Sequence, residues 1–185
     1  IVQLVLGVGL ALLLNRSFKF SNLASAIALL PYLIPTAILG FFALFMANGQ
    51  FGIINHLLTD LGLIQSNIGW YSNSELVLGS LILTNSWKVT IFVTLLVLAK
   101  LQSIPKNLYE AAQMSGASRF QQFRDITLPN LKGVIFIVLL LRSVWMFNKF
   151  DIIYILTRGG PLGRTTTVPI WAYETAFVDT QLVKA

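Results

Sequence analysis

Long apolar stretches separated by short polar segments dominate the pattern of this chain. A membrane-spanning helix needs about 20 largely apolar residues. Runs such as FVTLLVLA do not alternate between polar and apolar positions, as the strands of a membrane β-barrel would. The pattern therefore predicts an all-α, polytopic membrane protein. The candidate spans are Ile1–Leu14, which has the length of a partial span, and Ala24–Ala47, Leu76–Ala99 and Val134–Ile155, which have full length.

The polar segments between these spans carry a charge pattern that predicts their sides of the membrane. Segments 15–23 and 100–133 are rich in Lys and Arg, whereas segment 48–75 carries Asp60 and Glu75 and neither Lys nor Arg. Basic loops lie preferentially in the cytoplasm. We therefore expect the first and third segments in the cytoplasm, and the second, together with the segment that follows the fourth span, outside.

Composition agrees with this class and excludes others. Hydrophobic residues make up 56% of the 185 residues and charged ones 11%, well below the roughly 25% of a soluble domain. The mean hydropathy is +0.76. The chain has no cysteine and a single histidine, His56, so a disulfide, a thiolate metal site and a histidine cluster are excluded. The net charge is +6, and the positions of the Lys and Arg residues fit the marking of the cytoplasmic side of a membrane protein. We therefore expect no nucleic-acid partner.

Two details of the spans and loops predict local structure. In the outer segment, apolar residues recur at helical spacing and predict a short interfacial helix, followed by Trp70 and Tyr71 as aromatic anchors. Pro31 and Pro35 are expected to kink the second span. The apolar residues of the interfacial helix are Ile53, Ile54, Leu57, Leu58 and Leu61.

The stretch YEAAQMSGASRFQQFRDITLPN, residues 109–130, interrupts the apolar pattern. A helix is expected to begin near Pro105, since proline suits the first turn, and to end at Gly116. Ser118 can cap a second short helix. Pro129 either ends this helix or opens the next span. The stretch is therefore predicted to be a helix, a tight glycine turn and another helix, displayed in the cytoplasm for a partner.

The same stretch resembles the EAA signature of binding-protein-dependent ABC importer permeases. The signature residues fall at Glu110-Ala111-Ala112, then Gly116, then Ile126 and Leu128-Pro129. The segments LLPYLIPTAILG and LLLRSVWMFNKFDIIYILTRGGP resemble the sugar-importer branch, with its maltose-type and glycerol-phosphate-type permeases. The resemblance implies a type I ABC importer transmembrane domain. Residues 1–185 would form a single permease domain, truncated at both ends and holding about four of the six core helices.

In that family, the EAA helix couples the permease to its ATPase. The resemblance implies that residues 100–133 form a cytoplasmic coupling loop in which Glu110 makes a polar contact with the ATPase, Ala111 and Ala112 allow close packing, and Gly116 provides the turn. It also implies as partners an ATP-binding subunit dimer, a second homologous permease, an extracytoplasmic solute-binding protein and a carbohydrate or related polyol.

No catalytic role is expected for this chain. It contains no phosphate-binding loop of the G-x-x-x-x-G-K-[ST] type, so ATP and Mg are assigned to the partner ATPase and no cofactor to this chain. The glycine-rich segment Thr157–Thr167 would lie outside, where the family's permeases meet the binding protein. Turn chemistry alone also accounts for its Gly159-Gly160-Pro161 sequence.

Ionisable residues inside the spans suggest a substrate pathway. Counting 1.5 Å per residue, Lys88 lies roughly 16 Å from Ala99, and Arg142 about 15 Å from Lys132, so both fall near mid-membrane. In the resembling maltose-type permeases, the cavity is lined from these two helices. A structural alternative is that the two cations bond backbone carbonyls or a partner subunit. The predicted pathway residues are Asn85, Lys88, Phe92, Arg142 and Met146.

Three alternatives remain to be weighed against a sugar permease. An ABC permease for amino acids or peptides would share the EAA stretch, although the segment FNKFDIIYILTRGGP favours sugars. An ion-coupled secondary transporter would require acidic groups within the spans, and none lies mid-span. A membrane scaffold that transports nothing would have no need for polar residues at the same depth in two spans.

Overall fold

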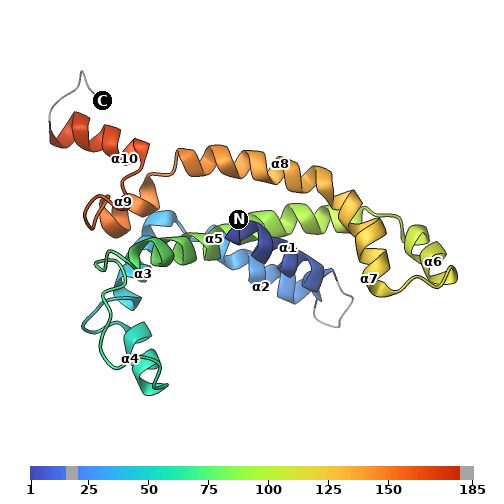
Figure 1. Cartoon of the computed structure of the whole chain (residues 1–185), viewed down its shortest axis with the longest axis horizontal. Coiled ribbons are helices and arrows are strands. Elements are labelled where there is room, and N and C mark those ends of the chain that lie inside the picture. Colours follow the sequence, from blue (N-terminus) through green and yellow to red (C-terminus); the bar gives the residue numbers. More distant parts are fainter. Residues whose placement is uncertain (16–20, 180–185) are drawn as a thin grey trace. The chain divides into compact units, whose positions relative to one another are not determined.

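The computed structural model describes residues 1–15 and 21–179, and in these residues every regular element is helical, which confirms the all-α class (Figure 1). The elements are α1 (Val2–Leu14), α2 (Ser21–Leu33), α3 (Thr36–Met46), α4 (Ile53–Asp60), α5 (Val77–Gln102), α6 (Lys106–Met114), α7 (Arg119–Gln122), the π-turn η1 (Phe123–Thr127), α8 (Leu128–Phe147), α9 (Asp151–Thr157), α10 (Val168–Tyr173) and a second π-turn, η2 (Glu174–Val178).

Two helices among the described residues are long and apolar enough to cross a membrane, Val77–Gln102 and Arg119–Phe147. The bent pair α2 and α3 would add a third span if it crosses as one, and α1 is a shorter apolar helix. The predicted spans at Ile1–Leu14 and Leu76–Ala99 are thus confirmed as apolar helices.

The predicted span Ala24–Ala47 is not one continuous helix. α2 ends at Leu33, and α3 begins at Thr36 with Pro35 as its N-cap. Proline lacks an N–H donor and pushes the preceding residue out of the helical region, so the break falls at Ile34 and Pro35. Pro31, by contrast, lies inside α2.

The predicted boundaries of the fourth span, Val134–Ile155, are wrong at both ends. The long apolar helix runs from Arg119 through the π-turn to Phe147, and α9 is a separate helix that starts at Asp151. Pro129 does not end the short helix α7, which stops at Gln122, and it lies in the first turn of α8, which begins at Leu128. Leu128 N–H bonds the Phe123 carbonyl five residues back, and this wider turn accommodates the proline that follows.

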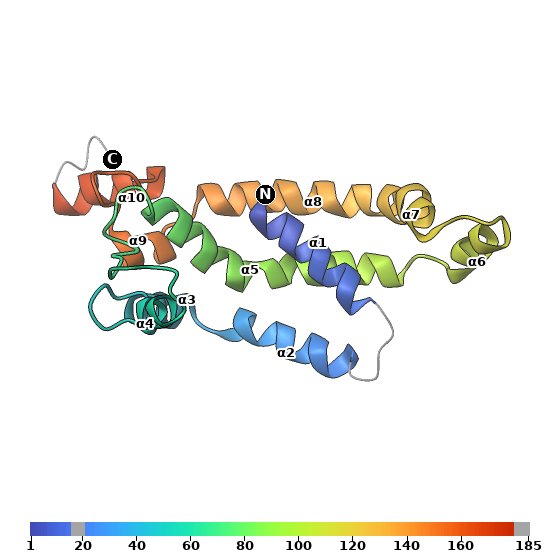
Figure 2. The same ribbon diagram turned by 60° about the horizontal axis from the view of Figure 1, so that its bottom comes forward.

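The chain forms two compact units, and helices α5 and α8 each contribute to both. The first unit comprises Ile1–Leu33 and Ser86–Ser143, and the second comprises Ile34–Asn85 and Val144–Ala185. In the first unit, α1 and α8 pack against α5 (Figure 2). Its buried core consists of Ala11, Val93, Val97, Leu98, Leu101, Ile104, Leu131 and Val138.

In the second unit, α3 packs closely on α9. A Cβ placed at Gly40 would lie 2.7 Å from Ile155 Cγ2, so only glycine allows this approach. The buried residues of the unit are Leu39, Val77, Leu81, Ile152 and Leu156.

The predicted interfacial helix is present as α4, and its loop is organised by a residue that the sequence pattern did not single out. Asn55 is 1% exposed. Its Nδ2 donates to the carbonyls of Asn48 at 3.2 Å and Ile68 at 2.9 Å, and its Oδ1 accepts the Trp70 indole N–H at 2.9 Å. The hydroxyl of Tyr71 shares a hydrogen bond of 2.8 Å with Thr84 Oγ1.

Truncation of this amide is expected to destabilise the second unit. Asn55→Ala would remove the partner of the Ile68 carbonyl and of the Trp70 indole N–H, whereas the Asn48 carbonyl keeps the Gly52 N–H, and the expected cost is about 2–3 kcal/mol. Thermal unfolding of the detergent-solubilised protein would measure this. Asn67→Ala is the matched control at an exposed position of the same loop, with an expected change within about 0.5 kcal/mol. Equal losses in the two variants would contradict the role of Asn55.

Candidate functional site

Helix α6 begins and ends where its sequence predicts. Pro105 is the N-cap, and Gly116 follows the helix with φ +78°, in the left-handed region that favours glycine. Gly116 N–H donates to the Gln113 carbonyl and Ala117 N–H to the Ala112 carbonyl, each at 2.9 Å. This pair of bonds is the Schellman motif, and it fixes the direction of the chain as it leaves α6.

The start of α7 is fixed equally well. Ser118 Oγ accepts a hydrogen bond from Gln121 N–H at 3.3 Å, and Ser118 N–H donates to Gln121 Oε1 at 2.7 Å, which completes a capping box. Gln122 Nε2 donates to the Ala117 carbonyl at 2.9 Å. We call residues 115–118 the elbow, and these bonds hold it on both sides.

The helix before the elbow displays a mixed surface. Figures 1 and 2 show α6 and the elbow beyond the ends of α5 and α8. Glu110 and Ala111 are exposed and Ala112 is half-buried, while Met114 is 90% exposed and Phe120, on α7 after the elbow, is 72% exposed. Exposed apolar side chains beside a carboxylate and small alanines suit the docking of another protein surface.

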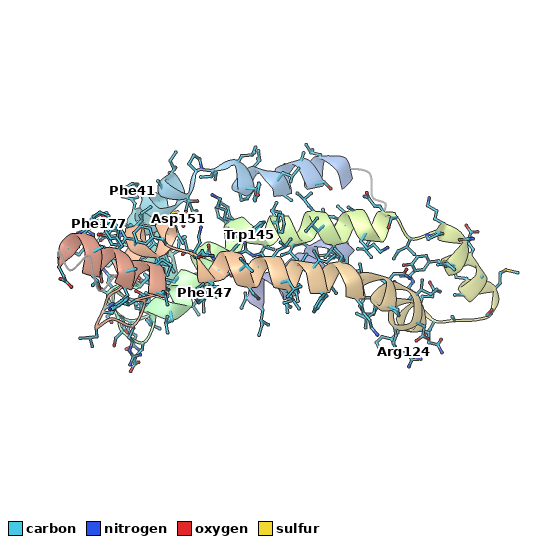
Figure 3. All side chains as sticks on the ribbon, turned by 90° about the horizontal axis from the view of Figure 1, so that it is seen from above. Phe41, Arg124, Trp145, Phe147, Asp151 and Phe177 are labelled. Atoms are coloured by element: carbon cyan, nitrogen blue, oxygen red, sulfur yellow. The ribbon has the colours of Figure 1, made fainter. Side chains whose placement is uncertain are left out.

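The base of α8 carries charged residues on its outer side. Arg124 and Asp125 form an exposed ion pair with Nε 2.7 Å from Oδ1. Figure 3 shows Arg124 near the elbow, pointing away from α5. An exposed pair of this kind adds little stability, but it keeps this end of the helix polar.

A hydrogen bond between α6 and the π-turn was not predicted from the sequence. Tyr109 and Thr127 share a hydrogen bond of 2.9 Å between their hydroxyl oxygens. Tyr109 and Ile126 also pack against the core of the first unit. Nothing in the residue pattern pairs two positions 18 apart across a turn.

Two predicted pathway residues meet in the second unit. Asn85 is buried, and its Nδ2 lies 3.5 Å from Met146 Sδ. Both line a pocket of about 190 Å³. The other polar residues of its wall are Lys149, Arg164, Thr165, Thr166 and Thr167.

The cations at this pocket are held by neighbours within the same unit. Lys149 Nζ lies 2.7 Å from Asp151 Oδ1, and Arg164 Nη1 donates to the Ser74 carbonyl at 2.9 Å. Thr165 Oγ1 donates to the Gly160 carbonyl at 2.7 Å, so the segment Thr157–Thr167 is an ordered turn. The wall of the pocket thus combines aliphatic side chains with polar ones.

The remaining pathway candidates belong to the first unit. Arg142 donates from Nε and Nη2 to Gln3 Oε1 at 3.1 and 2.8 Å, so α1 of the same chain holds the guanidinium. Lys88 and Phe92 are half-buried on α5. The sequence pattern did not pair Gln3 with Arg142, because the two are 139 residues apart.

Comparison with known proteins gives the family. A family model described as "Binding-protein-dependent transport system inner membrane component" matches residues 3–183. The trehalose/maltose transport system permease protein MalF of Thermococcus litoralis is 41% identical over 173 residues, which cover 94% of this chain and 58% of that protein. The sulfoquinovosyl glycerol transport system permease protein SmoG of Agrobacterium fabrum is 35% identical over 178 residues, covering 95% and 57%.

A solved structure agrees with these relatives. The crystal structure of a bacterial ABC transporter involved in the import of the acidic polysaccharide alginate contains a chain that is similar to this one, with a TM-score of 0.85 and 25% identity over 95% of this chain and 62% of that one. The chain therefore spans about 60% of the length of the relatives that it matches. The family match over residues 3–183 shows that the chain belongs to the binding-protein-dependent transport system inner membrane components, which are transport permeases of the inner membrane.

Proposed function

We propose that this chain is a permease subunit of an ATP-driven, binding-protein-dependent importer for a carbohydrate or a related polyol. ATP is hydrolysed by a separate subunit dimer. A second homologous permease completes the membrane pathway, and an extracytoplasmic solute-binding protein delivers the substrate. The basic segment 100–133 lies in the cytoplasm and carries the coupling helix α6.

The observation that carries the proposal is the folded form of the EAA stretch. Glu110, Ala111 and Ala112 lie on a short helix that ends at the left-handed Gly116. This helix is displayed next to two helices long enough to span a membrane. Such an element has little use within the chain itself, and it suits the transmission of movement from a cytoplasmic partner.

The substrate class is supported by the relatives and by the pocket. One of the two relatives is named as a trehalose/maltose permease and the other as a sulfoquinovosyl glycerol permease. The similar solved structure is that of an ABC transporter involved in the import of alginate. The pocket in the second unit places the Asn85 amide among aliphatic side chains. Amides can bond sugar hydroxyls, and apolar walls can contact the C–H faces of a sugar ring.

The pathway proposed for the substrate includes Asn85, Lys88, Phe92, Arg142 and Met146. Asn85 and Met146 contact each other and are the part of this set best supported as a lining. Arg142 is held by Gln3, so we assign it a structural contact with α1 in addition to any contact with substrate.

Uptake of a labelled sugar into vesicles that contain the complete importer tests the proposal. Uptake is expected to require ATP inside the vesicle and the binding protein outside, and to persist when ionophores abolish ion gradients. Uptake that continues without ATP and collapses with the ion gradient would identify a secondary transporter instead. ATP-dependent uptake of amino acids or peptides, with no uptake of any sugar or polyol, would overturn the substrate class.

A further inference from the structure

We propose that the hydrogen bond between Tyr109 and Thr127 pins the coupling helix to the base of the long membrane helix, so that α6 and α8 move as one body. Tyr109 and Thr127 are then positioning residues for ATP coupling. This inference rests on the proposed function, because it assigns a mechanical role within ATP-driven import.

The hydrogen bond joins the π-turn, where Thr127 is buried, to α6, whose Glu110 is exposed to solvent. Thr127 is 6% exposed and is the last residue of the π-turn that leads into α8. Tyr109 is half-buried and directly precedes Glu110, which is exposed on α6. The two hydroxyl oxygens are 2.9 Å apart. The contact therefore connects the buried base of a membrane helix to the residue next to the proposed docking surface.

Packing supports the same connection. Tyr109 and Ile126 pack on the buried core of the first unit. That core includes Leu101 near the end of α5, Ile104 in the segment that follows α5, and Leu131 near the start of α8. The phenol ring thus packs against the core that α5 and α8 share, and its hydroxyl reaches the π-turn. A force applied to α6 is therefore passed both to this core and to the base of α8.

The elbow holds α6 at its C-terminal end only. The Schellman bonds and the capping box fix the backbone at residues 115–118, which is a single point of attachment on the C-terminal side of α6. Tyr109 lies in the first half of this helix, toward its other end. The Tyr109 bond adds an attachment there, beside the chain connection from the buried Ile104, and so restricts rotation of α6 about the elbow.

The sequence context of the π-turn strengthens the argument. Thr127 Oγ1 also lies 3.5 Å from the Gln122 carbonyl, so the hydroxyl faces the wider backbone turn as well as the phenol. π-turns within α-helices frequently occur at functional sites. The pin therefore lies at the one irregular point of the helix Arg119–Phe147.

Removal of one hydroxyl tests the proposal. Tyr109→Phe keeps the ring in the core and removes the bond, and Thr127→Val removes the partner oxygen. Thr127→Ser retains the hydroxyl and is expected to restore coupling. The matched control is Tyr71→Phe, because Tyr71 shares a similar hydrogen bond of 2.8 Å with Thr84, and both residues belong to the second unit, whereas α6 belongs to the first.

The readout is the number of sugar molecules imported per ATP hydrolysed by the complete importer. Tyr109→Phe and Thr127→Val are each expected to lower this ratio about threefold to tenfold, the range that loss of one hydrogen bond predicts. The double variant is expected to resemble either single one, since both remove the same contact. Tyr71→Phe is expected to lower thermal stability to a similar degree and to leave the ratio unchanged.

Two results separate the possible failures. If the unmodified importer couples uptake to ATP and the Tyr109→Phe variant keeps the full ratio, the pin is wrong and the proposed function stands. If the unmodified importer shows no ATP-dependent uptake, the proposed function itself is overturned. A decrease in the Tyr71→Phe ratio equal to that of Tyr109→Phe would also overturn the pin, because general destabilisation would then explain the loss.

Discussion

Replacement of Gly7 by valine is expected to separate α1 from α5 and to destabilise the first unit by about 3 kcal/mol or more. A Cβ at Gly7 would lie 2.6 Å from both Val93 Cβ and Val93 Cγ1, and 3.1 Å from the Thr90 carbonyl oxygen. Carbon atoms in contact lie about 3.5–4.0 Å apart, so the helices would have to move about 1 Å away from each other. Val93 Cβ is fixed to the backbone and cannot move aside.

The chemistry of membranes makes this contact important. Lipid chains are as apolar as leucine, so helices associate there mainly through close packing, often at small residues spaced four apart. Gly7 and Ala11 have this spacing and are both buried. The same helix contributes Gln3, which holds Arg142 on α8. Displacement of α1 would therefore also disturb this polar contact.

The neighbouring glycine provides the control. Gly9 lies in the same helix, and a Cβ placed there meets no atom within 4 Å. Gly9→Val is expected to change stability by no more than about 0.5 kcal/mol. Thermal unfolding of the detergent-solubilised protein compares the two variants directly. Equal destabilisation by both would show that helix flexibility, and not close packing, is what Gly7 provides.

Local signals made the elbow predictable from the sequence. Pro105, Gly116 and Ser118 act through backbone geometry within a few residues of themselves, and each has its predicted role in the structure. The same holds for Pro35, although the sequence predicted a kink where the helix is broken. Short-range rules thus identified where helices begin and end whenever a proline, a glycine or a capping side chain marks the place.

Boundaries and distant contacts were not predictable in the same way. Hydropathy placed the start of the fourth span where apolar residues begin, at Val134, but helices are defined by backbone hydrogen bonds, which run on from Arg119. Asn55 and the Gln3–Arg142 contact depend on chain segments brought together by folding. No periodicity in one segment reports a partner in another, so these residues required the structure.

Replacement of Gly116 by valine is expected to reduce ATP-driven uptake at least tenfold. Gly116 has φ +78°, where a β-branched residue is strongly disfavoured, and a Cβ there meets no atom within 4 Å. The expected penalty of about 2 kcal/mol therefore comes from the backbone and corresponds to roughly a 30-fold shift away from the native elbow. The native orientation of α6 is then disfavoured by this factor, and the variant transmits the ATPase movement poorly.

A second glycine in the chain offers a matched control. Gly62 follows α4 with φ +70° and no neighbour of its Cβ within 4 Å. Gly62 N–H bonds the Thr59 carbonyl and Leu63 N–H the Leu58 carbonyl, each at 2.9 Å, which is the same motif as at the elbow. Gly62→Val is expected to cost similar stability. Vesicle uptake per assembled importer should nevertheless stay close to that of the unmodified protein.

An asparagine at the elbow separates backbone conformation from the mere presence of a side chain. Asparagine tolerates the left-handed region better than other residues with a Cβ, so Gly116→Asn is expected to keep most of the uptake that Gly116→Val loses. If both variants are equally inactive, φ is not the reason for the glycine. No atom of this chain lies within 4 Å of a Cβ at Gly116, so the added side chain would then clash with the docked ATPase surface. Equal loss of uptake in Gly62→Val would instead assign the effect to general stability and remove the elbow from the coupling mechanism.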